Sequence, residues 1–213
     1  MPENYQAMTD FFAAISVTWA ATSQLEIISV TFGLAYIVLA AKENSWCWPA
    51  AFIGTGTAIF LFWDASLLME SGLNIYYLAM AIFGLWQWQK GGPKGSNLVI
   101  STWGMQQHFV TLSLIAVLTI SSGWLLSTNT NAALPYLDSF TTWSAVITTW
   151  MVTRKILDNW LYWIVINFFS IILYLERGLY LYALLFVIYI FIAVFGYINW
   201  RNSYSANLVN DQQ

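Results

Sequence analysis

The chain has 213 residues, of which 59% are apolar and only 8% are Asp, Glu, Lys or Arg, against about 25% charged residues in an ordinary soluble domain. This composition, with a mean hydropathy of +0.63 and a net charge of −3, excludes a soluble globular domain and a nucleic-acid-binding protein with a basic face. It is typical of an integral membrane protein. Aromatic residues make up 18%, more than interfacial belts need, so some aromatic side chains should lie inside the protein.

Seven stretches are long and apolar enough to cross a bilayer, which takes about 20 residues each. They are Gln24–Ala41, Ser45–Ala65, Ser71–Gln89, Gln107–Leu126, Ala133–Val152, Leu157–Leu175 and Gly178–Trp200. Each should be a helix, because hydrocarbon offers no partner to a free backbone N–H or C=O. Residues 10–22 are too short to cross and are predicted to form an interfacial helix. The chain also lacks the basic start of a cleaved signal peptide.

The charged residues divide between the two ends of these spans. Six of the seven basic residues lie where spans 1, 3, 5 and 7 end, and only Arg177 lies on the other side, together with seven of the ten acidic residues. The positive-inside rule then predicts an external amino terminus and a cytoplasmic carboxyl terminus. The acidic outer side has two interpretations: it follows from the positive-inside bias alone, or it concentrates a cationic solute.

An internal repeat appears when the chain is aligned with itself so that Trp48 falls on Trp160. This alignment places spans 1–3 on spans 5–7 and leaves the fourth span as a linker. The other matched pairs include Tyr77 and Tyr189, Gly84 and Gly196, Trp88 and Trp200, Glu26 and Asp138, and Lys42 and Arg154. Because four crossings separate the equivalent spans, the two halves have the same orientation in the membrane, as in the SWEET sugar carriers.

The predicted fold is therefore an all-α integral membrane protein with two parallel three-helix repeats joined by a linker helix. Its expected parts are an external interfacial segment (1–23), the first repeat (24–90), a linker with the fourth span (91–132), the second repeat (133–202) and a cytoplasmic tail (203–213). Transporters of this kind bind their solute between the halves, near the middle of the membrane.

Polar and aromatic residues recur at helical spacing on the third and sixth spans. The candidate solute-binding residues are Asn74 and Tyr77 on the third span, and Trp160, Trp163, Asn167, Ser170 and Tyr174 on the sixth. Asn167 is the strongest candidate, because an amide near mid-span is costly unless it faces protein or a cavity. Tyr and Trp faces favour a flat, positively charged ring by about 1–2 kcal/mol each when water is excluded.

Each candidate also has a purely structural interpretation. Ser and Asn on transmembrane helices often join helices to one another, and Trp88, Trp160 and Trp200 near span ends are typical of belt or packing residues. We expect His108 to be interfacial and Cys47 to be a packing residue. The sequence contains no Ser/His/Asp grouping, phosphate loop or metal-ligand spacing, so it predicts no enzyme, no cofactor and no metal.

Two stretches resemble the PnuC family of bacterial vitamin transporters. They are Asp158-Asn-Trp-Leu-Tyr-Trp-Ile-Val-Ile-Asn167 with Leu173-Tyr174 and 178–185, and Tyr77–Trp88 with its Phe-Gly and Trp-x-Trp ending; Trp46-x-Trp48 adds to the match. The resemblance covers most of residues 24–202. It implies a SWEET-like inner-membrane carrier that moves nicotinamide riboside by facilitated diffusion, with a cytoplasmic kinase trapping the product. Other members carry thiamine or riboflavin, and Asn74-Ile-Tyr-Tyr77 departs from the Gln-Phe-Tyr-like pattern of the nicotinamide riboside carriers.

The sequence thus favours a membrane-embedded uniporter of a small cationic vitamin, nicotinamide riboside or thiamine. The protein could also form a homo-oligomer. A substrate-binding membrane subunit of a multi-component importer and a SWEET-type sugar carrier are the alternatives. Short inner loops leave little docking surface for an ATPase partner, and the aromatic excess disfavours a sugar.

Overall fold

The computed structural model describes residues 24–64, 68–130, 134–176 and 180–210, and the predicted interfacial helix at 10–22 lies outside them. In these ranges the chain forms seven long α-helices and a short 3-10 turn, η1 (Pro93–Gly95). The helices are α2 (Gln24–Ala41), α3 (Cys47–Asp64), α4 (Leu68–Lys90), α5 (Met105–Asn129), α6 (Pro135–Thr153), α7 (Asn159–Glu176) and α8 (Tyr180–Asn210).

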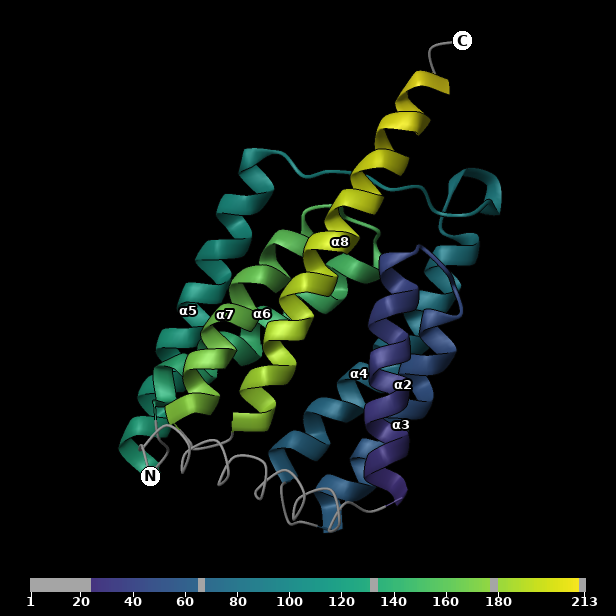
Figure 1. Cartoon of the computed structure of the whole chain (residues 1–213). Helices are drawn as coiled ribbons and strands as arrows, with labels where there is room; N and C mark the ends of the chain where they lie inside the picture. The colour runs from purple at the N-terminus through teal and green to yellow at the C-terminus, as the bar shows by residue number, and fades with distance from the viewer. Residues whose placement is uncertain (1–23, 65–67, 131–133, 177–179, 211–213) are drawn as a thin grey trace, which may run out of the picture.

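Each predicted span coincides with one of these helices, with ends that agree within a few residues. The exception is α8, which continues to Asn210, whereas the apolar pattern predicts an end at Trp200. The residues beyond Trp200 contain neither Gly nor Pro, so nothing stops the helix there, but they are too polar to match a hydrocarbon environment. Hydropathy therefore locates the end of the membrane crossing and not the end of the helix, which projects beyond the bundle (Figure 1).

Within the described ranges, four helices are long and apolar enough to cross a membrane by length and composition: α2, α5, α7 and the segment Tyr182–Val209 of α8. The helix α3 contains a shorter apolar stretch, Cys47–Leu61. The helices α4 and α6 are more polar. They contact each other inside the protein, and α6 buries hydroxyl side chains such as Ser144 and Thr148. A helix that faces protein does not need the lipid-facing composition of the others.

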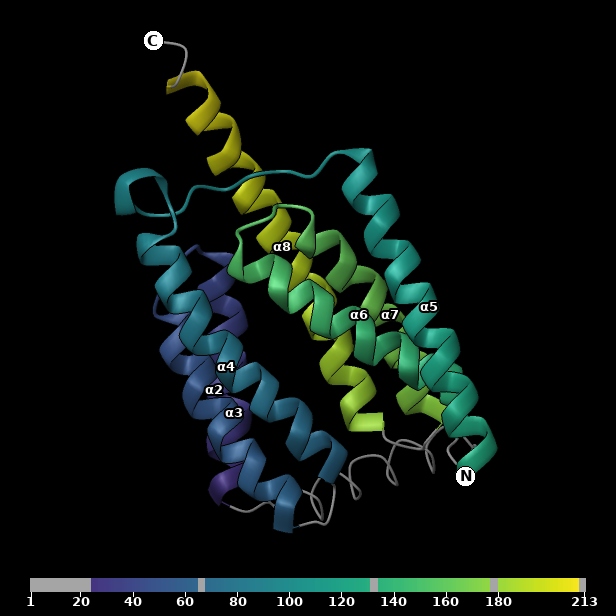
Figure 2. The ribbon, with the colours of Figure 1, turned by 180° about the vertical axis from the view of Figure 1, so that it is seen from behind.

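The helices form two groups, α2–α4 and α6–α8, with α5 packed on the outer side of α6 (Figures 1 and 2). Between the groups, α2 contacts α8 and α4 contacts α6. The alignment of the two repeats places α2 on α6 and α4 on α8, so these two contacts are one contact repeated about a pseudo-twofold axis. The predicted arrangement of two three-helix repeats is what the packing shows.

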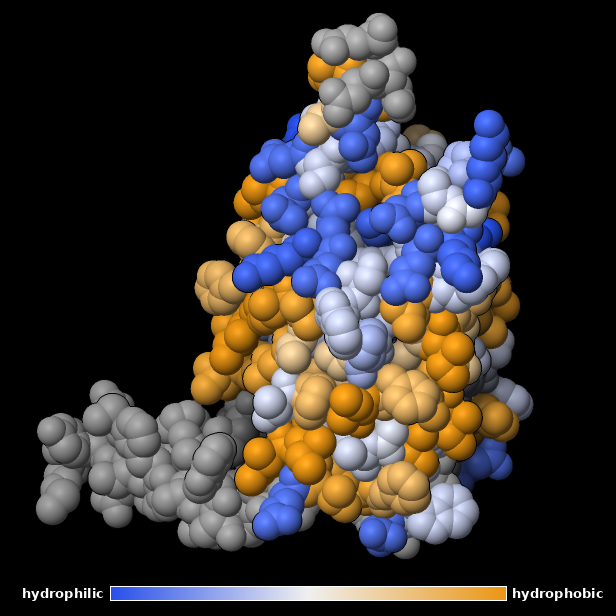
Figure 3. Space-filling model, turned by 90° about the vertical axis from the view of Figure 1, so that its right-hand side faces the viewer, coloured by the Kyte–Doolittle hydropathy of each residue, from blue (hydrophilic) through white to orange (hydrophobic). Residues whose placement is uncertain are grey.

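The two ends of the bundle differ in charge. The α2–α3, α4–α5 and α6–α7 connections and the end of α8 lie together at the upper end in Figure 1. Every described Lys and Arg lies at this end, namely Lys42, Lys90, Lys94, Arg154, Lys155 and Arg201, and we call it the basic end. Figure 3 shows hydrophilic residues gathered there above an apolar band. The opposite, acidic end carries Glu26, Asp64, Asp138 and Glu176.

Candidate solute-binding site

A cavity of about 500 Å³ lies between the two groups of helices. Residues from α2, α3 and α4 of the first repeat and from α6, α7 and α8 of the second line it. The volume falls within the range of sites for small organic molecules, about 300–1,000 Å³. The cavity therefore stands where a carrier with parallel repeats is expected to bind its solute.

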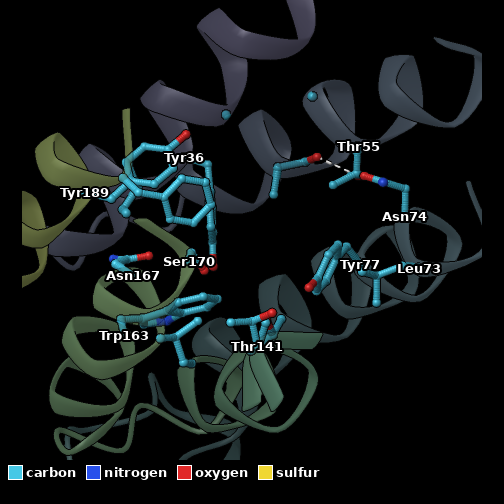
Figure 4. A pocket seen from close by; sticks show the side chains of 18 of the residues that line it. Tyr36, Thr55, Leu73, Asn74, Tyr77, Thr141, Trp163, Asn167, Ser170 and Tyr189 are labelled. Carbon is cyan, nitrogen blue, oxygen red and sulfur yellow. Dashed lines mark hydrogen bonds between the residues drawn. The ribbon is translucent and has the colours of Figure 1, made fainter. Parts of the chain in front are cut away.

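All seven residues predicted from helical spacing line this cavity: Asn74, Tyr77, Trp160, Trp163, Asn167, Ser170 and Tyr174. Figure 4 shows Trp163, Asn167 and Ser170 of α7 on one side and Asn74 and Tyr77 of α4 across from them. The candidate residues of α4 and those of α7, which are far apart in the sequence, thus face the same cavity. Their contact with a solute stays a prediction.

The Asn167 side chain is buried, with 2% of its surface exposed. Its Nδ2 atom has no hydrogen-bond partner among the residues that the structure describes. A buried amide without a partner costs about 1–3 kcal/mol on protein-based scales, and native proteins rarely leave one unpaired. Because Asn167 also borders the cavity, its N–H group is suited to donate to an acceptor on a bound molecule.

Aromatic rings form much of the cavity wall. Tyr36 of α2 and Tyr189 of α8 lie beside Asn167, opposite Tyr77 (Figure 4). The centre of the Phe186 ring lies 5.1 Å from the centre of the Tyr174 ring and 5.5 Å from that of the Tyr189 ring. The surplus of aromatic residues in the composition is thus partly accounted for by this wall, which offers ring faces and hydroxyl groups to the same molecule.

The two repeats contribute unequally to the cavity. On one face, α3 presents small side chains where α7 presents larger or more polar ones. The lining residues at equivalent positions of the two repeats are Ala51 and Trp163, Gly54 and Ile166, Thr55 and Asn167, and Ala58 and Ser170. The small side chains of α3 therefore leave space in the cavity, and α7 lines that space with larger or more polar groups.

The helix α3 packs closely against α2 beside this space. A Cβ atom at Gly54 would lie 3.2 Å from the backbone nitrogen of Gly33, and the Ser29 hydroxyl donates to the Gly54 carbonyl at 3.0 Å. Only glycine permits this approach without a shift of the backbone. The α2–α3 pair is therefore closely packed at a point where both helices line the cavity.

Comparison with known proteins identifies the family. Residues 23–202 match the family described as nicotinamide mononucleotide transporter. The chain belongs to this family. The predicted membership is confirmed, and with it the prediction that the protein is a membrane transporter and not an enzyme.

Individual relatives of this transporter also transport vitamins. It is 24% identical over 209 residues to the nicotinamide riboside transporter PnuC of Escherichia coli (strain K12), with 85% of this chain and 86% of that protein covered. It is 21% identical over 180 residues to the riboflavin/roseoflavin transporter RibM of Streptomyces davaonensis, with 82% and 83% covered. The chain is therefore a multi-pass member of a family of vitamin transporters.

A solved structure confirms the predicted fold of this family member. The crystal structure of the vitamin B3 transporter PnuC has a TM-score of 0.69 to this chain, at 21% identity, covering 94% of this chain and 90% of that one. At that identity the likeness establishes the seven-helix fold. The residues that bind the solute have to be argued from the cavity itself.

The sequence did not predict several of the residues that line the cavity, above all Asp138. This carboxylate lies in the first turn of α6, and hydropathy alone assigns it to the acidic rim. Among the described lining residues it is the one charged side chain. Tyr36, Thr141 and Tyr189 were missed as well. For Tyr189 the signal was available, because it is the repeat equivalent of Tyr77.

His108 and Cys47 lie outside the cavity lining. His108 is half-buried at the start of α5, where its Nδ1 atom lies 2.9 Å from the Tyr162 hydroxyl and its Nε2 atom 3.9 Å from Asp158. Cys47 is fully buried. In the described part of the chain, no three His, Cys, Asp or Glu side chains come close enough to hold a metal ion.

Trp88, Trp160 and Trp200 also pack inside the protein. They are at most 2% exposed, which favours packing over an interfacial belt. Trp160 borders the cavity as well.

Proposed function

We propose that this protein is a facilitated-diffusion carrier for a small cationic vitamin, nicotinamide riboside or thiamine, in a bacterial inner membrane. The observation that carries the proposal is the charge of the cavity. Asp138 is acidic, and none of the described lining residues is Lys, Arg or His. A cavity with one carboxylate and several aromatic faces stabilises a flat cation that has lost part of its water.

The same charge argument disfavours phosphorylated solutes. A phosphate group needs Arg, Lys or backbone N–H donors to replace its hydration, and Asp138 would repel it. This favours a riboside over a mononucleotide as the solute. It also supports trapping: after a cytoplasmic kinase adds a phosphate, the product no longer fits the carrier that admitted the vitamin.

The orientation follows from the charges at the two ends. The positive-inside rule favours a cytoplasmic location for the basic end, so Asp138 at the acidic end would face the outside. A solute arriving from there would meet the carboxylate before it reaches Asn167 and Trp163 deeper along α7. The electrostatic attraction would raise the local concentration of a cation at the mouth of the cavity.

A binding screen with purified protein tests the proposal. We expect nicotinamide riboside or thiamine to bind and nicotinamide mononucleotide not to bind. Asp138→Asn should weaken binding of the cation about tenfold, which corresponds to about 1.4 kcal/mol, and leave any binding of neutral riboflavin unchanged. Glu26→Gln is the matched control, since Glu26 is the repeat equivalent of Asp138 and is absent from the described lining residues.

Transport is tested in liposomes. Vesicles that contain the protein, the matching kinase and ATP should accumulate labelled vitamin, whereas vesicles without the kinase should only equilibrate it. Tighter binding of riboflavin than of both cations, with no effect of Asp138→Asn, would contradict a cationic solute. Accumulation without any kinase would contradict facilitated diffusion.

A further inference from the structure

The first helix of each repeat ends in the same way at the basic end. Glu43 after α2 and Lys155 after α6 occupy equivalent positions of the two repeats, and both have left-handed backbones, with φ of 55° and 49°. The hydrogen bonds that close the two helices also match, from Asn44 N to Leu39 O at 3.0 Å and from Ile156 N to Met151 O at 3.1 Å. Glycine is the residue that usually occupies this position.

Both positions nevertheless carry long charged side chains, and these side chains pair with each other. Nζ of Lys155 lies 3.5 Å from Oε2 of Glu43, and it lies 4.7 Å from the centre of the Trp88 ring. Lys155 is buried. Burial lowers the pKa of its ammonium group, and the Glu43 carboxylate partly offsets that effect. Glu43 and Lys155 thus both have a backbone conformation that is unfavourable for residues other than glycine, and their side chains form an ion pair between the repeats.

Two tryptophans add a reciprocal pair of hydrogen bonds between the repeats. Nε1 of Trp88 on α4 donates to the Val152 carbonyl of α6 at 2.9 Å. Nε1 of Trp200 on α8 donates to the Ala40 carbonyl of α2 at 2.9 Å. The two donors are repeat equivalents and so are the two acceptors, so the last helix of each repeat binds the end of the first helix of the other.

The indole rings continue this contact beneath the cavity. The ring centres of Trp48 and Trp88 lie 5.3 Å apart, those of Trp88 and Trp200 lie 5.7 Å apart, and those of Trp160 and Trp200 lie 5.5 Å apart. A Cβ atom at the repeat-equivalent Gly84 or Gly196 would overlap the ring of Trp48 or Trp160. Trp48 and Trp160 line the cavity. Trp48 and Trp160 therefore form the floor of the cavity at the basic end, and Trp88 and Trp200 pack against them.

We propose that these four tryptophans and the Glu43–Lys155 ion pair are the gate of the carrier at its basic end, which we call the tryptophan gate. Both indole hydrogen bonds and the ion pair run between repeats and not within one. A movement that separates the repeats at this end breaks all three together and opens the cavity floor. The gate does not depend on which vitamin the cavity accepts, so its test and the binding screen fail independently.

Cys47, the single cysteine of the chain, is a built-in reporter. It is fully buried and packs in one core cluster with Trp48 and Trp88. In full-length protein reconstituted in lipid nanodiscs, its rate of reaction with a water-soluble maleimide should follow the open fraction of the gate. We expect slow labelling of the unaltered protein.

Charge exchange provides the first test. Glu43→Lys places two ammonium groups together and should speed Cys47 labelling several-fold. The double variant Glu43→Lys/Lys155→Glu restores the pair with reversed direction, and it should return labelling to the original rate because the two positions are equivalent. Lys42→Glu, an exposed neighbour with a charge change of the same size, should leave the rate unchanged.

Loss of the indole hydrogen bonds provides the second test. Trp88→Phe and Trp200→Phe keep an aromatic ring but remove the donor, and each should speed labelling. Trp86→Phe on the exposed face of α4 should not. Labelling at the original rate in Glu43→Lys and in both Phe variants would overturn the gate. So would failure of the double charge variant, correctly folded by size-exclusion chromatography, to restore slow labelling.

Discussion

Trp163 on α7 and Ala51 on α3 occupy equivalent positions in the two repeats and line the same cavity. The difference in volume between an indole and a methyl group makes an almost symmetric pair of helices into an asymmetric site. One repeat lines the cavity with an indole ring, and the other lines it with a methyl group. The two repeats thus differ most where their helices line the cavity.

Enlarging the small side chain should therefore close the site. We expect Ala51→Leu to weaken solute binding about tenfold or more, because the added carbons occupy the space opposite Trp163. Overpacking of this kind costs about 1–3 kcal/mol. Titration calorimetry of the purified protein measures the effect. Ala79→Leu on the exposed face of α4 is the control, and equal affinity in both variants would place the solute elsewhere.

Asn167→Ala should lower the affinity for solute by about tenfold or more, since a lost polar contact away from water costs about 1–3 kcal/mol. The melting temperature should stay the same or rise, because Nδ2 of Asn167 has no partner among the described residues and its burial is costly. A residue that joins helices would show the opposite pattern, with lower stability and unchanged affinity. Asn202→Ala, exposed on α8, controls for the substitution itself.

Gly84→Ala and Gly196→Ala should each destabilise the protein by about 1–3 kcal/mol, because the new methyl group meets the ring of Trp48 or Trp160. Thermal unfolding in detergent provides the measurement. Gly72→Ala on α4, where a Cβ atom has nothing within 4 Å, should be neutral or stabilising. Similar melting temperatures for all three variants would mean that the rings move aside freely.

Tyr162→Phe should cost about 1 kcal/mol of stability, the typical contribution of one hydrogen bond. The Tyr162 hydroxyl lies 2.9 Å from Nδ1 of His108, and the two rings stack with their centres 5.9 Å apart, so this contact attaches α5 to α7. Tyr204→Phe removes a more exposed hydroxyl 3.5 Å from Thr102 and should change the melting temperature less. An equal change in both variants would exclude a special role for the His108 contact.

The sequence by itself determined the helices, their approximate ends, the repeat, and the two rows of polar and aromatic residues on α4 and α7 that line the cavity. These features are local: a lipid environment requires apolar helices of a set length, and helical spacing fixes which side chains share a face. The sequence alone therefore placed Asn167 and Tyr77 on the helix faces that line the cavity. The end of α8 at Asn210 could not, because hydropathy reports the membrane and not the helix.

Only the tertiary structure decided which faces meet. Asp138 looks like any rim carboxylate until α6 is placed beside the cavity. For Trp88 and Trp200 the sequence left belt and packing roles open, and the structure shows their indoles donating to the Val152 and Ala40 carbonyls. The pairing of Glu43 with Lys155 likewise joins residues from different repeats. Such contacts depend on the packing of distant segments, and the periodicity of a single helix carries no information about its partner.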